Sequence, residues 1–380
     1  MEGPGSVSDL LYSDTEEALR DSVRHLFADR CPPESVARAY DPQPQDFSSV
    51  WRTLAVELGV AGLLVPESLG GAGAGAREAA VVMEEIGRAV APVPFLSSAV
   101  LATVALLHAG DVETVSALAQ GELTAALVVP LSTAPGDPLG VMTRGTDGLN
   151  GSVTSVAGAA EADVLVVPVA GADGPELHTV PRTATGVEVT PLLALDMTRP
   201  IANVGFSAVA SSHVGPADGP VTEALRTGAA LLASEQLGIA QWCFHTTLEY
   251  AKQRKQFGRA IGSYQAIKHR LADLWFEVGA ATAAARYAAD TCARGDGDAA
   301  DTCARGDDDA AVAAAVAQAY CSGVAVHAAE ECVQLHGGIG MTWEYPAHLY
   351  LKRAKSDQLT FGTAYRHRAR LAELVDLPPN

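Results

Sequence analysis

The sequence of 380 residues lacks several features that mark whole classes of protein. Its six cysteines form no C-x-x-C pair and show no metal-ligand spacing with histidine, so we predict free thiols and no metal site. Lysine and arginine total 26 against 45 aspartates and glutamates, which gives a net charge of -19. Without a basic surface the chain is not expected to bind nucleic acid or an anionic membrane. Ordinary solubility accounts for the acidity equally well.

Long hydrophobic runs and a leader segment are also missing. No apolar run reaches the roughly 18 residues of a membrane-spanning helix, and no basic, apolar and small-residue leader opens the chain. We therefore expect a cytoplasmic protein without a membrane span. The hydrophobic fraction, 48%, is sufficient for a large core divided among two or three packed domains.

The first part of the chain, to about Leu123, has the hydrophobic periodicity of helices. Leu19, Val23 and Leu26 recur at positions i, i+4 and i+7, which places them on one helical face. The glycine-rich residues 65–75 interrupt this pattern and predict a loop. A helix is expected to resume after that loop.

Residues 125–215 differ from the helical regions on either side. Short runs of valine, leucine and alanine alternate there with proline, glycine, aspartate and threonine, which predicts a small antiparallel sheet domain. Helical periodicity returns beyond this region. The order predicts a mainly α fold with a central β domain. The expected domains are an N-terminal helical domain at 1–123, a central β domain at 124–218 and a C-terminal helical bundle at 219–380.

A short segment is duplicated in tandem near the end of the chain. Residues 290–300 and 301–311 are identical except at Gly297 and Asp308. The aspartates suggest a calcium loop, but no glutamate closes the required twelve-residue spacing. We therefore predict that the repeat lengthens an exposed connection between two helices.

Several motifs, taken in order, resemble those of the acyl-CoA dehydrogenase family over essentially the whole chain. The specific pair is Arg254-Lys-Gln-Phe-Gly258 and Cys332-Val-Gln-Leu-His-Gly-Gly-Ile-Gly340. Support comes from four further segments, Gly70-Gly71, Glu84-Glu-Ile-Gly87, Pro92–Ser98 and Glu344-Tyr-Pro346. The resemblance implies an N-terminal helical domain, a β-barrel-like sheet domain and a C-terminal four-helix bundle, with the bundles at the core of an oligomer.

The resemblance also implies FAD as the cofactor. A pyrophosphate needs fixed positive charge and free backbone N–H groups, whereas ribose and adenine need neutral amides. In the family, the corresponding positions hold the AMP half of the FAD of a neighbouring subunit. Here these positions are Arg254, Gln256, Phe257, Gln265, Gln334, Gly337 and Gly338. A simpler interpretation makes Arg254 a surface ion-pair residue and the two glycines a helix stop.

The sequence departs from the family where the catalytic base is expected. The family removes an α proton with a glutamate in a Tyr-Glu-Gly-Thr segment, which here is Thr360-Phe-Gly-Thr363. Phe361 cannot accept a proton. The alternative base position of some members is Gly228 in this chain, followed by Ala229. We therefore assign no catalytic residue, although two glutamates, Glu223 and Glu235, lie nearby in the sequence.

The segments expected to hold the flavin ring have changed as well. The family's loop and strand correspond to Val129–Asp137 and Ser155–Ala159, where the aromatic residue that faces the ring has become small. Beyond the glycine-threonine pair Gly362-Thr363, Tyr365 stands where the family has a glutamine. A subunit that has lost its base and its flavin cradle, yet keeps the residues that reach a neighbour's FAD, fits a division of labour between two subunits.

Three hypotheses follow. In the first, the chain resembles the non-catalytic subunit of the heteromeric α2β2 acyl-CoA dehydrogenases of actinobacteria. Its partners would be a catalytic subunit, a CoA thioester such as a sterol side chain, and electron-transfer flavoprotein as acceptor. In the second, a self-sufficient homo-oligomer uses Glu223, Glu235 or Asp357 as base. In the third, the protein is a flavin-free structural or CoA-binding relative. The presence of Arg254, Gln265 and Gln334 argues against this third hypothesis.

Overall fold

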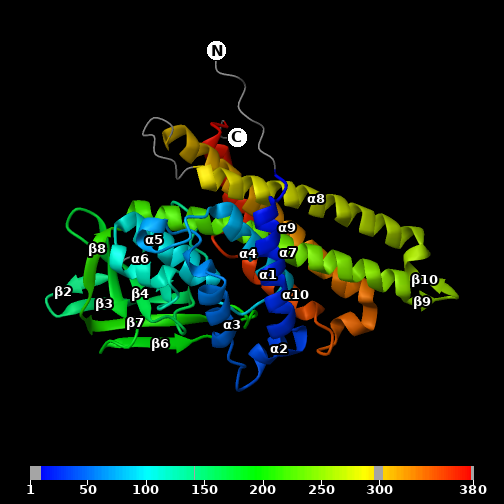
Figure 1. The fold of residues 1–380 in the computed structure, drawn as a ribbon, viewed down its shortest axis with the longest axis horizontal. Coiled ribbons are helices and arrows are strands. Elements are labelled where there is room, and N and C mark those ends of the chain that lie inside the picture. Colours follow the sequence, from blue (N-terminus) through cyan, green and yellow to red (C-terminus); the bar gives the residue numbers. More distant parts are fainter. Residues whose placement is uncertain (1–9, 141, 295–302, 378–380) are drawn as a thin grey trace, which may run out of the picture.

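Figure 1 shows a computed structural model of the chain, in which residues 10–140, 142–294 and 303–377 are described. Helices come first, then two small sheets, then long helices, so the predicted fold class is confirmed. The boundaries predicted at residues 123 and 218 remain a prediction.

The N-terminal region consists of short helices and helical turns. They are α1 (Asp14–Arg30), α2 (Pro33–Ala37), η1 (Arg38–Tyr40), α3 (Ser48–Arg52), η2 (Thr53–Glu57), η3 (Val60–Gly62), η4 (Glu67–Leu69), α4 (Ala76–Ala89), η5 (Phe95–Ala102), α5 (Thr103–Ala109) and α6 (Val112–Ala119). A capping box starts α1, since the Ser13 hydroxyl accepts from the Glu16 amide and the Glu16 carboxylate accepts from the Ser13 amide. Val23 is buried on this helix, as predicted, whereas Leu19 and Leu26 are only partly buried against the core.

The predicted loop at residues 65–75 is confirmed and contains only the single turn η4. Its glycines are required by geometry. Gly70 has a left-handed φ of 83°, and a Cβ on Gly71 would overlap the carbonyl group of Val65.

The central region forms two four-stranded sheets. One sheet has the order β1-β4-β5-β8 and the other β2-β3-β7-β6. The strands are β1 (Ala125–Leu127), β2 (Thr143–Gly145), β3 (Gly148–Ala157), β4 (Val164–Ala170), β5 (Pro175–Pro181), β6 (Val187–Pro191), β7 (Ile201–Val209) and β8 (Ser212–Pro216). The prediction of a purely antiparallel domain was wrong for one pair, because β1 and β4 are parallel. The chain passes through β2 and β3 between them and therefore returns in the same direction.

The first sheet lies between the helices and the second sheet. Leu127 and Val166 on one of its faces belong to the main helical core, whereas Ala126, Leu165 and Val167 on the other face pack with the second sheet. This alternation is the two-residue period of a strand that is covered on both faces. The sheet region is thereby joined to the helices by a continuous apolar contact.

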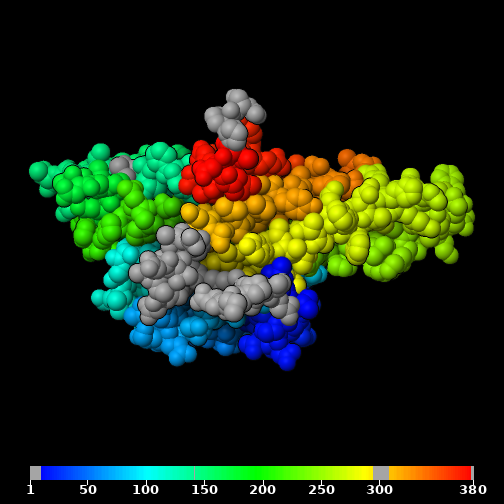
Figure 2. Space-filling view, turned by 90° about the horizontal axis from the view of Figure 1, so that it is seen from above, coloured from blue at the N-terminus to red at the C-terminus, as the bar shows by residue number. Residues whose placement is uncertain are grey.

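The C-terminal region contains long helices that pack against one another. They are α7 (Asp218–Gln253), α8 (Gln265–Arg294) and α9 (Cys303–His336), followed by η7 (Gly337–Met341), α10 (Ala347–Asp357) and α11 (Ala364–Leu374). The strands β9 (Lys255–Gln256) and β10 (Arg259–Ala260) form a small hairpin, continued by the turn η6 (Ile261–Ser263), between α7 and α8. Figures 1 and 2 show that this hairpin end projects beyond the rest of the molecule.

The Glu84–Gly87 motif lies where α4 crosses α7. A Cβ on Gly87 would overlap the carbonyl oxygen of Glu235, and a Cβ on Gly238 would overlap that of Glu84. The absence of side chains at both glycines lets the two helix backbones touch. The Glu84–Gly87 motif is thus explained by close helix packing.

Two expectations concern the last helices. The middle of the duplicated segment, residues 295–302, lies outside the described residues, so the predicted exposed connection stays a prediction; its first copy begins at the end of α8, where Asp290 and Thr291 are buried, and its second copy enters α9 at Cys303. The helix Asp308–Met341 has the length and hydropathy of a membrane span, which the sequence was not expected to contain. Since 67% of its apolar window is buried inside the structure, it has the character of a bundle core helix.

The glycine contact between α4 and α7 can be tested by adding one methyl group. We expect Gly87→Ala and Gly238→Ala each to lower the free energy of unfolding by about 1–3 kcal/mol, because two backbones would have to separate. Gly279→Ala on α8 is the matched control, since its Cβ would meet no atom of the described residues within 4 Å. That control should gain ~0.5–1 kcal/mol from helix propensity. Urea unfolding of the three variants checks this, and equal effects at all three positions would contradict it.

Candidate functional site

The two positions where the family places its base lie against each other. Phe361 is 1% exposed, and its ring covers Gly228 on α7. A Cβ on Gly228 would lie 3.0 Å from Cζ of Phe361 and 2.7 Å from Cδ2 of Leu101. Any side chain at residue 228 would therefore collide with the ring. An aromatic side chain thus fills the place where the resemblance predicts a catalytic carboxylate.

The backbone at Phe361 has an unfavourable conformation that the surrounding residues stabilise. Its φ of 57° is left-handed, which costs a bulky residue about 1–3 kcal/mol. Its amide donates to the carbonyl oxygen of Leu131 at 2.9 Å, and Nε2 of His367 lies 2.9 Å from its carbonyl oxygen. Burial lowers the pKa of His367, so the neutral ring donates this bond.

The backbone of Leu131 links two positions that the sequence resemblance singled out. Its amide donates to the carbonyl oxygen of Ser155 at 3.0 Å, while its own carbonyl oxygen accepts from Phe361. The resemblance assigns Ser155 to the ring-facing position and Phe361 to the base position, and both assignments remain predictions.

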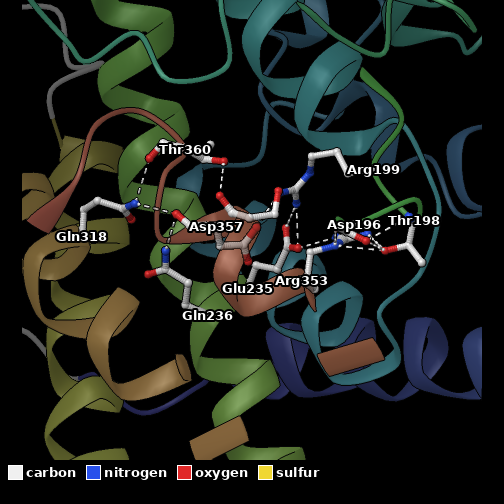
Figure 3. A network of polar contacts seen from close by, with 10 residues as sticks. Asp196, Thr198, Arg199, Glu235, Gln236, Gln318, Arg353, Asp357 and Thr360 are labelled. Carbon is white, nitrogen blue, oxygen red and sulfur yellow. Dashed lines mark hydrogen bonds and ion pairs between the residues drawn. The ribbon is translucent and has the colours of Figure 1, made fainter. Parts of the chain in front are cut away.

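Two of the alternative bases, Glu235 and Asp357, belong to a buried ion-pair network (Figure 3). The Arg199 guanidinium lies 2.5 Å from a carboxylate oxygen of Glu235 and 2.5 Å from one of Asp357. Arg353 pairs with Glu235 at 2.5 Å and with Asp196 at 2.6 Å. Neither Glu235 nor Asp357 has any exposed surface, and both are engaged by arginine. Both carboxylates are therefore engaged inside the protein and have no access to a substrate.

The network joins the sheet region to the helices. Asp196 and Arg199 come from the connection between β6 and β7, Glu235 from α7, and Arg353 and Asp357 from α10. Backbone carbonyls beside Phe361 are held as well, in bonds that Figure 3 shows. Gln318 donates to the carbonyl oxygens of Asp357 and Thr360, and Gln236 donates to that of Asp357.

The charges of the network do not cancel, because three carboxylates face two arginines. Burial, with the nearby negative charge of Glu235, raises the pKa of Asp357 to about 7, against the opposing effect of the two arginines. One proton is therefore held by the network at acidic pH and released near neutrality.

Glu223 is the remaining alternative base. It lines two cavities, of about 470 Å³ and about 560 Å³, that lie on either side of the first turns of α7. Its carboxylate pairs with Arg226 at 2.5 Å and accepts from the Thr227 hydroxyl at 3.2 Å. Glu223 is thus the one carboxylate of the three candidates that reaches a cavity.

The seven residues predicted to bind FAD lie at the projecting end of the molecule. Every one of them is exposed, and Phe257 is 93% exposed. Arg254, Gln256 and Phe257 stand at the end of α7 and in the hairpin, whereas Gln334 and the glycine pair end α9. The two helix ends touch, since the Tyr250 hydroxyl lies 3.5 Å from the carbonyl oxygen of His336. Their role in binding a cofactor remains a prediction.

The sequence interpretation missed the arginines of the buried network. Arg199 lies in a connection that contains no motif. Arg353 lies in a helix in which polar and apolar residues are mixed. One signal was available: Arg353 and Asp357 are spaced i, i+4 and therefore share a helical face. That spacing does not reveal that the face is buried.

The charge imbalance predicts how stability depends on pH. The pKa of Asp357 is higher in the folded protein than in the unfolded chain. The stability that the protonated side chain contributes is therefore complete at acidic pH and is lost as pH rises through about 7. Asp357→Asn should be destabilising at pH 5.5 and progressively less so towards pH 8. Melting temperatures of both proteins across this range measure the effect. A variant that loses more stability at pH 8 than at pH 5.5 would show the opposite sign.

Comparison with known proteins places the fold and site in a family. Residues 13–118 match the family profile "Acyl-CoA dehydrogenase, N-terminal domain" and residues 220–375 match "Acyl-CoA dehydrogenase, C-terminal domain". The chain is 34% identical over 361 residues to acyl-CoA dehydrogenase IpdE2 of Mycolicibacterium smegmatis, covering 94% of this chain and 98% of that protein.

Two solved structures are similar over nearly the full length. The ChsE4-ChsE5 complex from Mycobacterium tuberculosis superposes with a TM-score of 0.83 at 26% identity, covering 98% of this chain and 100% of that one. A variant of the Tcur3481-Tcur3483 steroid ACAD gives a TM-score of 0.78 at 28% identity, covering 96% and 98%. The chain belongs to the acyl-CoA dehydrogenase family, oxidoreductases that act on acyl-CoA with FAD as cofactor.

Proposed function

We propose that this chain is the non-catalytic subunit of a heteromeric FAD-dependent acyl-CoA dehydrogenase. In this proposal its exposed end contacts the AMP part of FAD across a subunit interface, and a partner subunit supplies the catalytic glutamate. The observation that carries the proposal is the contact between Phe361 and Gly228. Both places for a base are occupied by one aromatic ring, so this subunit has no group there to remove a proton.

The exposed end supports the second half of the proposal. Arg254 offers a fixed positive charge, and Gly337 and Gly338 offer backbone N–H groups without side chains, which together suit a pyrophosphate. Gln265 and Gln334 offer amides for ribose and adenine. A Cβ on either glycine would meet no atom of the described part of this chain within 4 Å, so the space beside them is open to another molecule.

An apolar surface on the bundle supports assembly with another subunit. Along α8, Phe276 is 71% exposed and Tyr287 48% exposed, and on the neighbouring α9 Tyr320 is 38% exposed. Large apolar side chains exposed along two neighbouring helices are a common feature of surfaces that contact another subunit. Gln265 and Gln334 stand at the ends of these two helices, so a subunit that covers the surface would reach the proposed FAD-binding residues.

The names of the similar structures suggest the kind of assembly and substrate. One is a complex of two proteins, ChsE4 and ChsE5, and the other is a steroid acyl-CoA dehydrogenase. We extend the proposal accordingly to a cytoplasmic α2β2 enzyme of the actinobacterial type that oxidises a CoA thioester, such as a sterol side chain. Electron-transfer flavoprotein would accept the electrons.

The division of chemistry then follows from the residues. FAD, when bound, accepts the hydride from the β carbon of the thioester. Arg254 neutralises the pyrophosphate, and the turn after α9 orients the dinucleotide from the side of this subunit. In this subunit the Phe361 ring lies where the resemblance places the base, so the proton would be removed in the partner's site.

A second candidate function is a self-sufficient dehydrogenase with a displaced base. The two cavities beside Glu223 favour this candidate, because they leave open space next to the Glu223 carboxylate at the first turns of α7. The ion pair of Glu223 with Arg226 argues against the candidate, since a paired carboxylate is a weaker base.

The FAD content separates the two candidates. We expect the chain produced alone to contain no FAD, and the complex with its partner to contain one FAD for every two chains. Absorbance at the flavin band, against protein mass, measures this ratio. A yellow and active assembly of this chain alone would refute the first proposal.

Arg254→Ala tests the proposed contact with FAD. Loss of the guanidinium should weaken FAD retention by the complex, because a charge-assisted bond to phosphate is worth about 1.5–3 kcal/mol. Arg259→Ala on the same hairpin is the control, since Arg259 stacks on Tyr264 at 3.9 Å and is not among the predicted FAD-binding residues. Retained FAD after gel filtration is the measurement, and equal losses in both variants would argue against a specific role for Arg254.

Substitutions in the closed centre test which subunit carries the chemistry. Phe361→Ala and Glu223→Gln in this chain should leave turnover of the complex nearly unchanged, because the partner holds the base. Steady-state kcat of the two variants, compared with the unaltered complex, checks this expectation. A large loss of kcat in Glu223→Gln would favour the displaced-base alternative instead.

A further inference from the structure

One buried histidine connects the two segments that carry the proposed FAD-binding residues. His336 is the last residue of α9 and is 3% exposed. Gly337, the next residue, has a left-handed φ of 64° and turns the chain into η7. The position of this turn therefore depends on how His336 is held.

Both nitrogens of the His336 ring have partners inside the protein. Nδ1 lies 2.6 Å from the carbonyl oxygen of Cys332, which can only accept, so Nδ1 carries a proton. Nε2 lies 2.6 Å from the Tyr345 hydroxyl, and Sγ of Cys332 lies 3.7 Å from Nδ1. These contacts fix the ring in one orientation.

Stacking links the same ring to the other segment. The His336 ring lies between Tyr250 and Tyr345, with centroid distances of 4.2 Å and 4.5 Å. Tyr250 belongs to the last turn of α7, and its carbonyl oxygen accepts from the Arg254 amide at 2.8 Å. A displacement of the histidine ring would therefore move Tyr250 and, through it, the start of the Arg254 segment.

We propose that His336 is a positioning residue that holds the Arg254 segment and the Gly337-Gly338 turn in register for the AMP half of a neighbouring FAD. This inference rests on the proposed function. Neither nitrogen of His336 is free to contact the cofactor, so its effect is exerted through Tyr250 and the turn. The chemistry it serves is recognition of a dinucleotide, and proton transfer has no part in it.

The experiment compares FAD with FMN, which lacks the AMP half. In the purified complex with the partner subunit, His336→Ala should raise the Kd for FAD roughly tenfold or more, as expected when binding groups are misplaced. The Kd for FMN should stay unchanged. Tyr345→Phe, which removes one hydroxyl and keeps the ring, should give a smaller change in the same direction. It also keeps the test decisive if His336→Ala is poorly folded.

His25→Ala is the matched control. Nδ1 of His25 lies 2.7 Å from the carbonyl oxygen of Asp21, the same local bond on an exposed face of α1. The His25→Ala variant should leave the affinities for FAD and for FMN unchanged. Equal weakening of FAD and FMN by the His336 and Tyr345 variants, or no weakening at all, would overturn the inference while leaving the proposed function in place. If Arg254→Ala also left FAD affinity unchanged, the proposed function itself would fail.

Discussion

Five charges in one buried network determine how the sheet region sits on the helices. Arg199 reaches from the sheet region to Glu235 and Asp357, and Arg353 reaches from α10 to Asp196. Removal of either arginine would leave buried carboxylates without a compensating charge, which costs about 3–5 kcal/mol. The connection between β6 and β7 is therefore anchored to α7 and α10. The segment after Asp357, which ends in Phe361, has little freedom to move.

The centre of the molecule, at Phe361, and the end that carries Arg254 differ in how accessible they are. The centre is closed: Phe361 contacts Gly228, and Leu131 links the base position to Ser155. The end that carries Arg254 and Phe257 is open, because both of these residues are exposed. A single fold thus combines an exposed end that carries the predicted dinucleotide-binding residues with a buried aromatic ring at the predicted base position. Family membership alone does not predict this combination.

The sequence predicted the elements with strong periodicity or a specific motif. Helices could be identified from their periodicity, and the resemblance to the family assigned the two base positions to Phe361 and Gly228. Their mutual contact could not be predicted, since it joins residues far apart in the sequence. Strands β5 and β8 could not be predicted individually, because their prolines and glycine resemble turns; β5 pairs with both β4 and β8. The buried arginines were missed because burial is a property of the packed structure.

The backbone around Phe361 explains how a subunit can lose a base and keep its fold. The left-handed conformation is unfavourable for phenylalanine, yet the bonds that hold it involve only the amide and the carbonyl group of that residue. Side-chain identity therefore contributes little to the shape of the loop. Exchange of a carboxylate for a ring removes the chemistry and fills the adjacent space above Gly228 with apolar contact. A loop held by its backbone permits this change without disturbing the network that anchors it.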